Sequence, residues 1–321
     1  MNTTVIIPNY NGMQYLPGCI ESLNKQTDKD FEILVVDNGS SDGSVKWLEE
    51  NHIRHIPLNS NMGFAGGVNV GIRAATTEFV LLLNNDTVAE PEFLATMKKA
   101  ICRSSKIFAV SAMMIKASDH SRIDSAGDGM TILGWAYQRG TDEPVEGYKK
   151  SGLIFSACAG AAIYRKNIFD EIGLFDEMHF AYLEDMDLSY RAKLAGYYNY
   201  YCSAAKVYHI GSATSGSKYN PFKVRLSARN NIYVHYKNQP GLQLILNFLP
   251  LLLGIVIKAG FFLKIGFFKD YLAGVHEGLT TCLKCKRTPR AKHGILSYLA
   301  IEGEMIVGMF EYTMSFIRRH I

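Results

Sequence analysis

The chain has 321 residues, which is enough for two domains with well-buried cores. Its composition is 48% hydrophobic, 12% aromatic and 20% charged, which excludes a disordered protein, a collagen-like repeat and a coiled coil. The net charge of +4 is unevenly distributed, because residues 241–321 carry ten Lys or Arg against five Asp or Glu. A near-neutral body with a basic, apolar tail fits a membrane surface and argues against nucleic-acid binding.

The first hundred residues alternate between short apolar runs and amphipathic segments. The apolar runs predict buried strands at 4–8, 32–37, 53–58, 78–83 and 108–114. The amphipathic segments predict helices through Leu16–Leu23 and Trp47–Leu48, and at 63–75 and 91–103. Because the strands are continuously apolar, we predict an α/β fold with a mostly parallel, Rossmann-like sheet and helices on both faces.

Polar residues follow three of these strands, at Asn9, Asp37 and 84–86. The carboxyl ends of parallel strands meet at one edge of a sheet, which is where α/β proteins bind their ligands. We therefore expect the functional site at this edge.

The middle of the chain is less regular. Residues 122–148 are rich in turn formers and predict a hairpin or an excursion over the sheet. We predict a strand at 154–164, a helix at 180–194 that carries three carboxylates, and short strands at 197–202 and 206–208. A Gly/Ser loop at 212–218 is placed to close over a bound ligand and exclude water.

The character of the chain changes after Pro240. Residues 241–257 carry no charge, and the apolar run continues to Phe268 with Lys258 and Lys264 inside it. Five cations follow within residues 284–292, and each contributes roughly 1 kcal/mol near an anionic lipid surface. We predict that 241–321 is a helical segment that associates with membrane lipids, or alternatively forms the interface of a homo-oligomer.

The cellular location of the protein can be predicted from the start of the sequence and from the apolar C-terminal segment. The chain opens directly into an apolar run, without the basic region of a signal peptide. We therefore expect the cytoplasmic face of the cell membrane, and leave open whether 241–268 spans the bilayer or lies on it.

Several side chains at the predicted edge suit cation and acid–base chemistry. Asp86 directly follows an apolar strand, where its carboxylate can bind a hard divalent cation. Asp185 adds a second carboxylate, and the imidazole of His209 can reach the same cation or a phosphate.

Seven segments, in this order along the chain, resemble glycosyltransferase family 2: 5–11, 35–40, 61–69, 84–86, 160–162, 184–187 and 209–212. The resemblance is greatest to the rhamnosyltransferase-like branch, which builds cell-surface polysaccharides. It implies a GT-A fold, with a nucleotide-sugar-binding half at 1–115 and an acceptor-binding half at 116–235. It also implies a metal-dependent, inverting sugar transfer that uses Mg²⁺ or Mn²⁺.

The resemblance also implies roles for individual residues. Pro8 and Tyr10 would line the pocket for the nucleotide base, and Asp37 would accept a hydrogen bond from a pyrimidine imide. Asp86 and His209 would hold the metal ion. Asp185 would be the general base. The other donor-binding positions are Asn38, Gly63, Asn69, Asn84, Asn85 and Arg229, and the acceptor-binding positions are Cys158, Ala159, Gly160 and Glu184.

These roles predict an enzyme that moves a sugar from a dTDP- or UDP-sugar to a lipid-linked or polysaccharide acceptor, with dTDP-rhamnose as the favoured donor. An inactive nucleotide-binding membrane scaffold is one alternative, because Asn84 replaces a carboxylate of the family's Asp-x-Asp pattern. A sugar-nucleotide nucleotidyltransferase is another. It would need a basic, glycine-rich loop after the first strand, and residues 9–12 contain no Lys or Arg.

Overall fold

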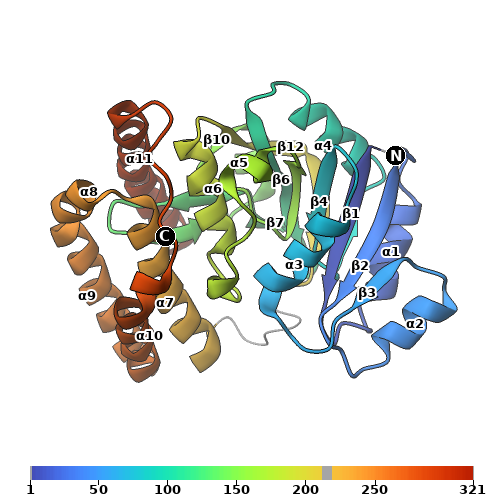
Figure 1. Ribbon diagram of the computed structural model, residues 1–321, viewed down its shortest axis with the longest axis horizontal. Coiled ribbons are helices and arrows are strands. Elements are labelled where there is room, and N and C mark those ends of the chain that lie inside the picture. The colour runs from blue at the N-terminus through green and yellow to red at the C-terminus, as the bar shows by residue number, and fades with distance from the viewer. Residues whose placement is uncertain (1, 212–218, 321) are drawn as a thin grey trace.

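The computed structural model describes residues 2–211 and 219–320 (Figure 1). Ten of the described strands form one sheet, whose main path runs β10-β12-β6-β11-β4-β1-β2-β3, while β5 pairs with β12 and β7 with β6. The strands are β1 (Thr3–Asn9), β2 (Phe31–Asp37), β3 (His55–Pro57), β4 (Phe79–Leu83), β5 (Thr87–Ala89), β6 (Ile107–Lys116), β7 (Asp119–Ser125), β10 (Gly152–Ile154), β11 (Ala161–Arg165) and β12 (Tyr198–His209).

The sheet is mixed rather than mostly parallel. Strand β1 pairs in parallel with β2 and β4, and this register places Asn9 opposite Asp37. Strand β11 runs antiparallel between β4 and β6. Because β11 runs the opposite way, its first residue, Ala161, lies opposite Leu83 at the end of β4. The residues that precede β11 are therefore placed at the polar edge of the sheet.

Helices cover both faces of the sheet, as predicted. Helices α1 (Leu16–Asn24), α2 (Ser44–Glu50) and α4 (Phe93–Ile101) pack with Val5 and Ile7 of β1 in one apolar core. Helices α3 (Gly63–Ala74), α5 (Ile168–Ile172) and α6 (Glu184–Leu194) pack in a second core that includes Ile6. Successive strand residues face opposite sides, so a continuously apolar strand contributes to both cores.

Three predicted elements have different boundaries. The 154–164 segment is not one strand, because Ser156 exchanges backbone hydrogen bonds with Asp128 and residues 155–160 form a loop before β11. The two strands predicted at 197–208 are the single strand β12, with a register shift between Cys202 and Lys206. The helix predicted from residue 180 begins at Glu184.

The turn-rich middle section contains a hairpin, which was one of its two predicted forms. Strands β8 (Asp128–Met130) and β9 (Ala136–Gln138) pair antiparallel, separately from the large sheet. The predicted boundary between the two halves, at 115–116, falls at the end of β6, and β6 lies between β11 and β12 within one sheet. The division into three regions stays a prediction. The loop predicted at 212–218 lies outside the described residues.

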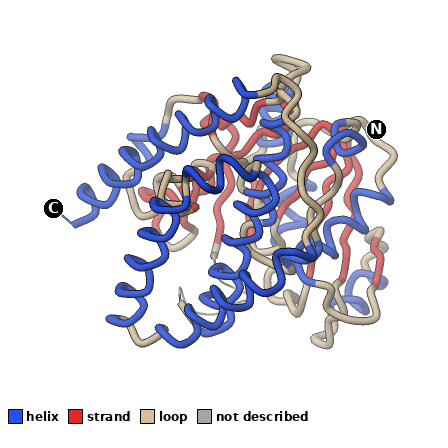
Figure 2. Tube along the Cα trace, turned by 60° about the vertical axis from the view of Figure 1, so that its left-hand side comes forward, coloured by secondary structure: helices blue, strands red, loops and turns tan. Residues whose placement is uncertain are grey.

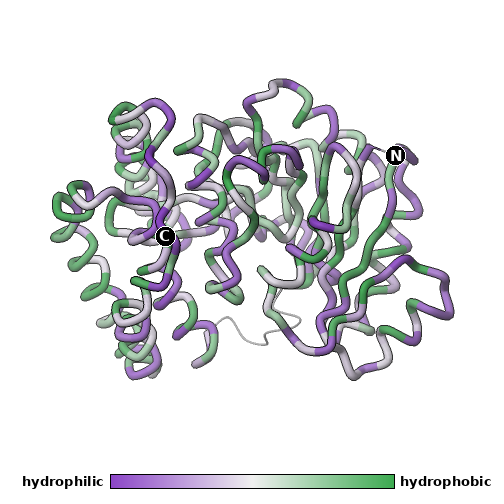
Figure 3. The backbone as a smooth tube through the Cα atoms, in the orientation of Figure 1, coloured by the Kyte–Doolittle hydropathy of each residue, from purple (hydrophilic) through white to green (hydrophobic). Residues whose placement is uncertain are grey.

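The C-terminal region is helical and lies beside the sheet, at the side opposite β1–β3 (Figures 1 and 2). Its helices are α7 (Pro221–Asn238), α8 (Gly241–Leu246), α9 (Phe248–Lys264), α10 (Phe268–Thr281) and α11 (Ile295–His320). The uncharged stretch is divided between α8 and α9 (Figure 3). None of the described helices combines the length and the apolar character needed to cross a bilayer.

Candidate active site

The edge where β1, β2 and β4 end is held by a chain of side-chain hydrogen bonds. The Asn85 amide donates to Asn9 Oδ1 (2.7 Å), and the Asn9 amide donates to Asp37 Oδ2 (2.8 Å). Asp37 Oδ1 accepts from the backbone N–H of Ser40 (2.9 Å). Asp37 is fully buried. Through these hydrogen bonds its carboxylate helps to hold together the loops that follow the three strands. Its contact with a pyrimidine base stays a prediction.

Pro8 and Tyr10 lie on either side of Asn9 at the same edge. Both are partly exposed, whereas Asn9 is buried. Because side chains alternate along an extended chain, Pro8 and Tyr10 face the same way, opposite to Asn9. This placement leaves them accessible to a ligand.

The start of α3 is fixed by three other predicted donor-binding residues. The Asn38 amide donates to the Gly63 carbonyl (2.9 Å), and its oxygen accepts from the backbone N–H of Met62 (2.9 Å). Gly63 has a positive φ of 75°, and a Cβ there would lie 2.4 Å from the Phe180 carbonyl oxygen, so no other residue fits. Asn69 is buried and bonds to the backbone N–H and carbonyl of Phe175. All three therefore hold neighbouring chain segments in place.

Asp86 and His209 meet at one corner of this edge. Strand β5 pairs with β12 so that Thr87 lies opposite His209, which brings the preceding Asp86 beside the imidazole. His209 Nε2 lies 3.2 Å from Asp86 Oδ1, and Nδ1 lies 2.8 Å from Asp124 Oδ2. Burial opposes the charged ring, but the hydrogen bonds to Asp124 and Asp86 outweigh it and raise the pKa of His209 to about 9.

These side chains fit a divalent cation. Two adjacent ligands of an octahedral Mg²⁺ lie about 3 Å apart, which matches the separation of Asp86 Oδ1 and His209 Nε2. Once Nε2 has lost its proton, that nitrogen would bind the ion while Asp124 accepts the Nδ1–H bond, as in carboxylate–histidine–metal arrangements. The Asn84 amide lies 3.4 Å from the same Nε2. Protein ligands on one side only would leave the other side of the ion for phosphate oxygens.

Asp185 lies on the first turn of α6, on the opposite side of residues 158–160. Its Oδ1 accepts from the backbone N–H of Met186 (2.7 Å), and its Oδ2 accepts from that of Ala159 (3.3 Å). Burial raises the pKa of this carboxyl above its usual range, against the opposing effect of the hydrogen bonds. A carboxylate held in this way can act as a general base.

Residues 158–160 connect this carboxylate to Asn84, which lies at the same edge of the sheet as Asp86 and His209. Ala159 donates to Asp185, and the carbonyl of the next residue, Gly160, accepts from the backbone N–H of Asn84 (2.9 Å). A Cβ on Gly160 would lie 3.1 Å from the Asn84 amide. The structure thus links Asp185 to Asn84, two residues before Asp86, through one short loop.

The segment before Asp185 has an unusual backbone. Phe180, Tyr182 and Leu183 have φ values of 61°, 69° and 66°, which cost free energy in residues with a side chain. The Asn230 amide donates to the carbonyls of His179 (2.9 Å), Ala181 (2.8 Å) and Tyr182 (2.7 Å). These three bonds from α7 hold the segment that positions the start of α6.

Arg229 lies next to Asn230 and also supports this segment. Its guanidinium donates to the carbonyls of Met178 and His179 (3.0 Å each) and pairs with Glu277 of α10 (3.0 Å). The structure therefore places Arg229 against the backbone of 178–179, away from Asp86 and His209. A contact with the donor stays a prediction.

The two acidic neighbours of Asp185 differ from each other. Glu184 is buried, its Oε2 has no hydrogen-bond partner among the described residues, and burial followed by the nearby Asp185 raises its pKa well above the usual range. Asp187 is fully buried but pairs with Arg191 (3.0 Å) and Lys237 (2.9 Å). Asp187 is therefore satisfied by structural ion pairs, whereas Glu184 lies beside Asp185 without such a partner among the described residues.

Sequence reasoning missed two residues of this site, Asp124 and Asn230, and the carboxylate of Asp128 near Asp185. Asp124, Asp128 and Asn230 lie in a turn-rich stretch and in a helix, where no motif spacing marks them. One signal was present in the sequence: Asp124 and Asp128 flank the small residues Ser125-Ala126-Gly127, a composition typical of closely approaching backbone.

The comparisons with known proteins identify the family of the chain. The sequence profile of "Glycosyl transferase family 2" matches residues 4–173, more than half of the chain. An N-acetylglucosaminyl-diphospho-decaprenol L-rhamnosyltransferase of Mycobacterium tuberculosis is 26% identical over 242 residues, which cover 66% of this chain and 77% of the relative.

Two solved structures share the fold. GalNAc-T7, crystallised with UDP, GalNAc and Mn²⁺, superposes with a TM-score of 0.59 at 14% identity, over 74% of this chain and 48% of that one. A mannosyltransferase of Pyrobaculum calidifontis, in complex with GDP-Man and Mn²⁺, gives 0.55 at 17% identity, over 87% of both chains. The chain is a glycosyltransferase with a GT-A-like fold and belongs to glycosyltransferase family 2, and the mycobacterial rhamnosyltransferase is one of its relatives.

Proposed function

We propose that this enzyme transfers a sugar, with rhamnose favoured, from a nucleoside diphosphate to a lipid-linked or polysaccharide acceptor, and inverts the anomeric centre. Asp185 is the general base, and Asp86 with His209 holds Mg²⁺ or Mn²⁺. One observation supports the proposal most strongly. The loop at 158–160 contacts both the acceptor side and the donor side of the proposed site, because Ala159 bonds to Asp185 while Gly160 bonds to Asn84.

The reaction needs one base and a stabilised leaving group. The acceptor oxygen forms a bond to the anomeric carbon while the bond from that carbon to the diphosphate breaks, and the hydroxyl proton passes to Asp185. The N–H groups of Met186 and Ala159 orient the carboxylate before the reaction. A divalent cation, when bound, supplies positive charge against the leaving diphosphate. The Asp124 carboxylate orients His209 for that role.

The identity of the substrates is supported by the mycobacterial relative. Its name gives L-rhamnose as the sugar and a diphospho-decaprenol as the acceptor, and the match covers most of both chains. We therefore favour dTDP-rhamnose as donor and a polyprenyl-diphosphate sugar as acceptor, with a UDP-sugar as the second candidate donor.

The C-terminal helices support docking on the membrane that carries such an acceptor. Leu242, Ile245 and Leu249 at the junction of α8 and α9 are each 69–73% exposed. The cations at residues 284–292 are exposed as well. Apolar side chains together with cations favour the interface of an anionic bilayer. We propose peripheral attachment to the cytoplasmic face of the membrane.

A donor panel tests the proposed function. The purified protein is mixed with dTDP-rhamnose, UDP-glucose and UDP-N-acetylglucosamine, with and without Mn²⁺, and release of nucleoside diphosphate is measured in the presence of N-acetylglucosaminyl-diphospho-decaprenol. We expect Mn²⁺-dependent turnover with dTDP-rhamnose. Asp185→Asn should abolish turnover and preserve donor binding, while the exposed Asp119→Asn should change neither. Donor binding by the wild type without any turnover would favour the inactive scaffold.

A further inference from the structure

Asp128 is a buried carboxylate to which neither the sequence resemblance nor the metal corner gives a role. It is the first residue of β8, and its backbone is fixed by two hydrogen bonds with Ser156 (2.9 and 3.0 Å). Its side chain is only 7% exposed, and its Oδ1 has no hydrogen-bond partner among the described residues. A buried carboxylate oxygen without a donor is costly, so this oxygen is expected to serve a function.

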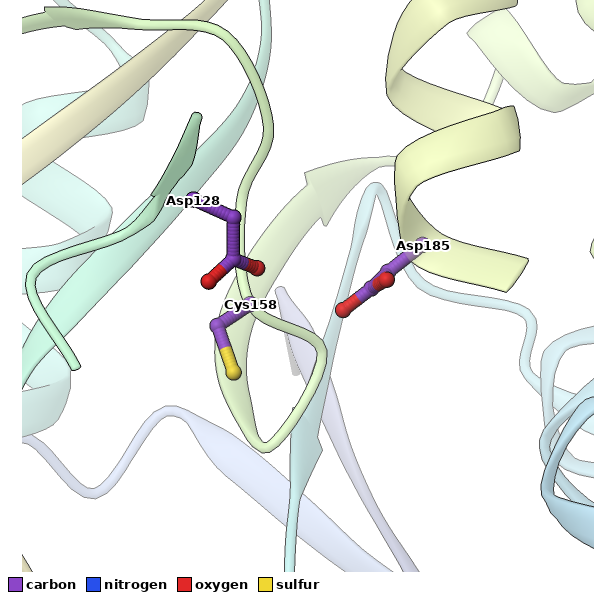
Figure 4. Close-up of side chains that lie close together, drawn as sticks. All are labelled: Asp128, Cys158 and Asp185. Carbon is purple, nitrogen blue, oxygen red and sulfur yellow. The ribbon is translucent and has the colours of Figure 1, made fainter. Parts of the chain in front are cut away.

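The side chain of Asp128 is directed at the general base. A carboxylate oxygen of Asp128, the thiol sulfur of Cys158 and a carboxylate oxygen of Asp185 all lie within 4.8 Å of one another. Figure 4 shows the two carboxylates close together with the Cys158 thiol beside them, and Asp128 comes from the β8 hairpin and Asp185 from α6. Two structurally separate elements thus bring two acidic groups to one point.

The surroundings of this pair are mostly acidic or neutral. Asp124 and Glu184 add negative charge near Asp128, and Arg139 is the cation that opposes them. On the side of Asp185, Cys158 and the buried Tyr164 are uncharged at neutral pH, because burial raises the pKa of each well above its usual range. Burial, followed by repulsion from Asp185, likewise raises the pKa of Asp128 well above that of a free carboxyl. Two desolvated carboxylates at this separation do not both ionise near neutral pH.

We propose that Asp128 is the second carboxyl group of the acceptor site and that Asp128 and Asp185 hold one proton between them. The protonated member donates a hydrogen bond and the ionised member accepts one, so the pair matches two neighbouring hydroxyl groups of an acceptor sugar. The part that concerns the acceptor rests on the proposed function. The shared proton is a property of the protein alone.

The proton balance of the transfer is then defined. Before the reaction, Asp128 carries the shared proton and Asp185 is ionised. The acceptor hydroxyl loses its proton to Asp185 as its oxygen bonds to the anomeric carbon and the diphosphate leaves with the electron pair of the broken bond. Both carboxyl groups are then protonated. One proton passes to solvent after the product departs, which restores the pair.

Infrared difference spectroscopy of the protein without substrates tests the shared proton. At pH 7 we expect a carboxylic-acid C=O band that shifts in D₂O and is lost in both Asp128→Asn and Asp185→Asn. The band should persist in Asp119→Asn, which removes an exposed carboxylate whose hydrogen bonds to Ser121 keep its pKa low. Circular dichroism confirms that each variant is folded. If Asp128→Asn does not fold, Asp185→Asn decides the question.

Glu184 is the main alternative site for the proton, because it is also a buried carboxyl, and its Oε2 has no hydrogen-bond partner among the described residues. Glu184→Gln should leave the expected band in place. Loss of the band in Glu184→Gln but not in Asp128→Asn or Asp185→Asn would place the proton on Glu184 and overturn the proposal, as would a wild type without any such band. Since no sugar nucleotide is used, this outcome is independent of the donor panel.

Discussion

The side-chain nitrogen of Asn230 lies 2.7 Å from the carbonyl oxygen of Tyr182, two residues before Glu184. Tyr182 and Leu183 both have positive φ, so this bond holds a strained turn at the point where α6 begins. Asn230 is completely buried on α7. The conformation of the segment that precedes Asp185 therefore depends on a helix far from it in sequence.

Asn230→Ala should lower kcat more than it lowers donor affinity. The substitution leaves the carbonyls of Ala181 and Tyr182 without their donor, which costs about 1–3 kcal/mol for a buried group, while the His179 carbonyl keeps its bond from Arg229. The turn is then expected to relax and misorient Asp185, with a loss of kcat of roughly tenfold or more. Steady-state kinetics and thermal unfolding measure the two effects. A stable Asn230→Ala enzyme with unchanged kcat would contradict this role.

Asp124→Asn should weaken Mn²⁺ binding by about 10- to 100-fold, as expected for loss of the carboxylate that orients a metal-binding histidine. Asp124 Oδ2 lies 2.8 Å from His209 Nδ1, and an amide provides a weaker acceptor there. Calorimetric titration of Mn²⁺ in the presence of a nucleoside diphosphate measures the change. Asp119→Asn, on the same strand β7, is the matched control and should bind Mn²⁺ normally.

Two buried histidines should each lower the stability of the protein as the pH falls from about 6.5 towards 4. Burial lowers the pKa of His179 and of His235 to about 4, below the value of about 6.5 in an unfolded chain. Between these values the unfolded state binds more protons, so acidification favours unfolding, by at most about 3 kcal/mol per histidine. Urea unfolding at pH 7 and pH 5 measures the slope. His235→Gln should reduce it, and an unchanged slope would argue against a buried neutral imidazole.

Ile245→Asp should reduce binding to vesicles that contain anionic lipid. Ile245 is 73% exposed on α8, and a carboxylate there opposes insertion into the interface. Leu153→Asp changes a side chain of similar exposure, 65%, on β10 of the main sheet and should bind as the wild type does. Sedimentation with vesicles separates the two. If Ile245→Asp instead converts a dimer into a monomer and leaves vesicle binding intact, the exposed face is an interface between copies.

Most of the strands in residues 1–115, the predicted nucleotide-sugar-binding half, could be predicted from sequence because their signals are local. Continuous apolar runs ending in Asn9, Asp37 and Asn84 mark parallel strands and their carboxyl ends. The structure confirms each of these strands within a few residues.

The other half depends on contacts between distant segments. The reversed direction of β11 is set by pairing with β4 and β6, and the small residues before it read as a strand because they are buried. Asp128 and Asp185 meet only through tertiary structure, and the bonds of Asn230 join α7 to residues about 50 positions earlier. Such partners carry no periodic pattern that a single sequence could reveal.

The loop at residues 158–160 has a consequence for the order of events. Its backbone bonds to Asn84 on the donor side and to Asp185 on the acceptor side, so a shift of one contact displaces the other. Under the proposed function, binding of the donor next to Asn84 would be transmitted over three residues to the carboxylate of Asp185. Such mechanical coupling would favour a compulsory sequence in which the donor binds first, and it would limit wasteful reaction with water until the second substrate arrives.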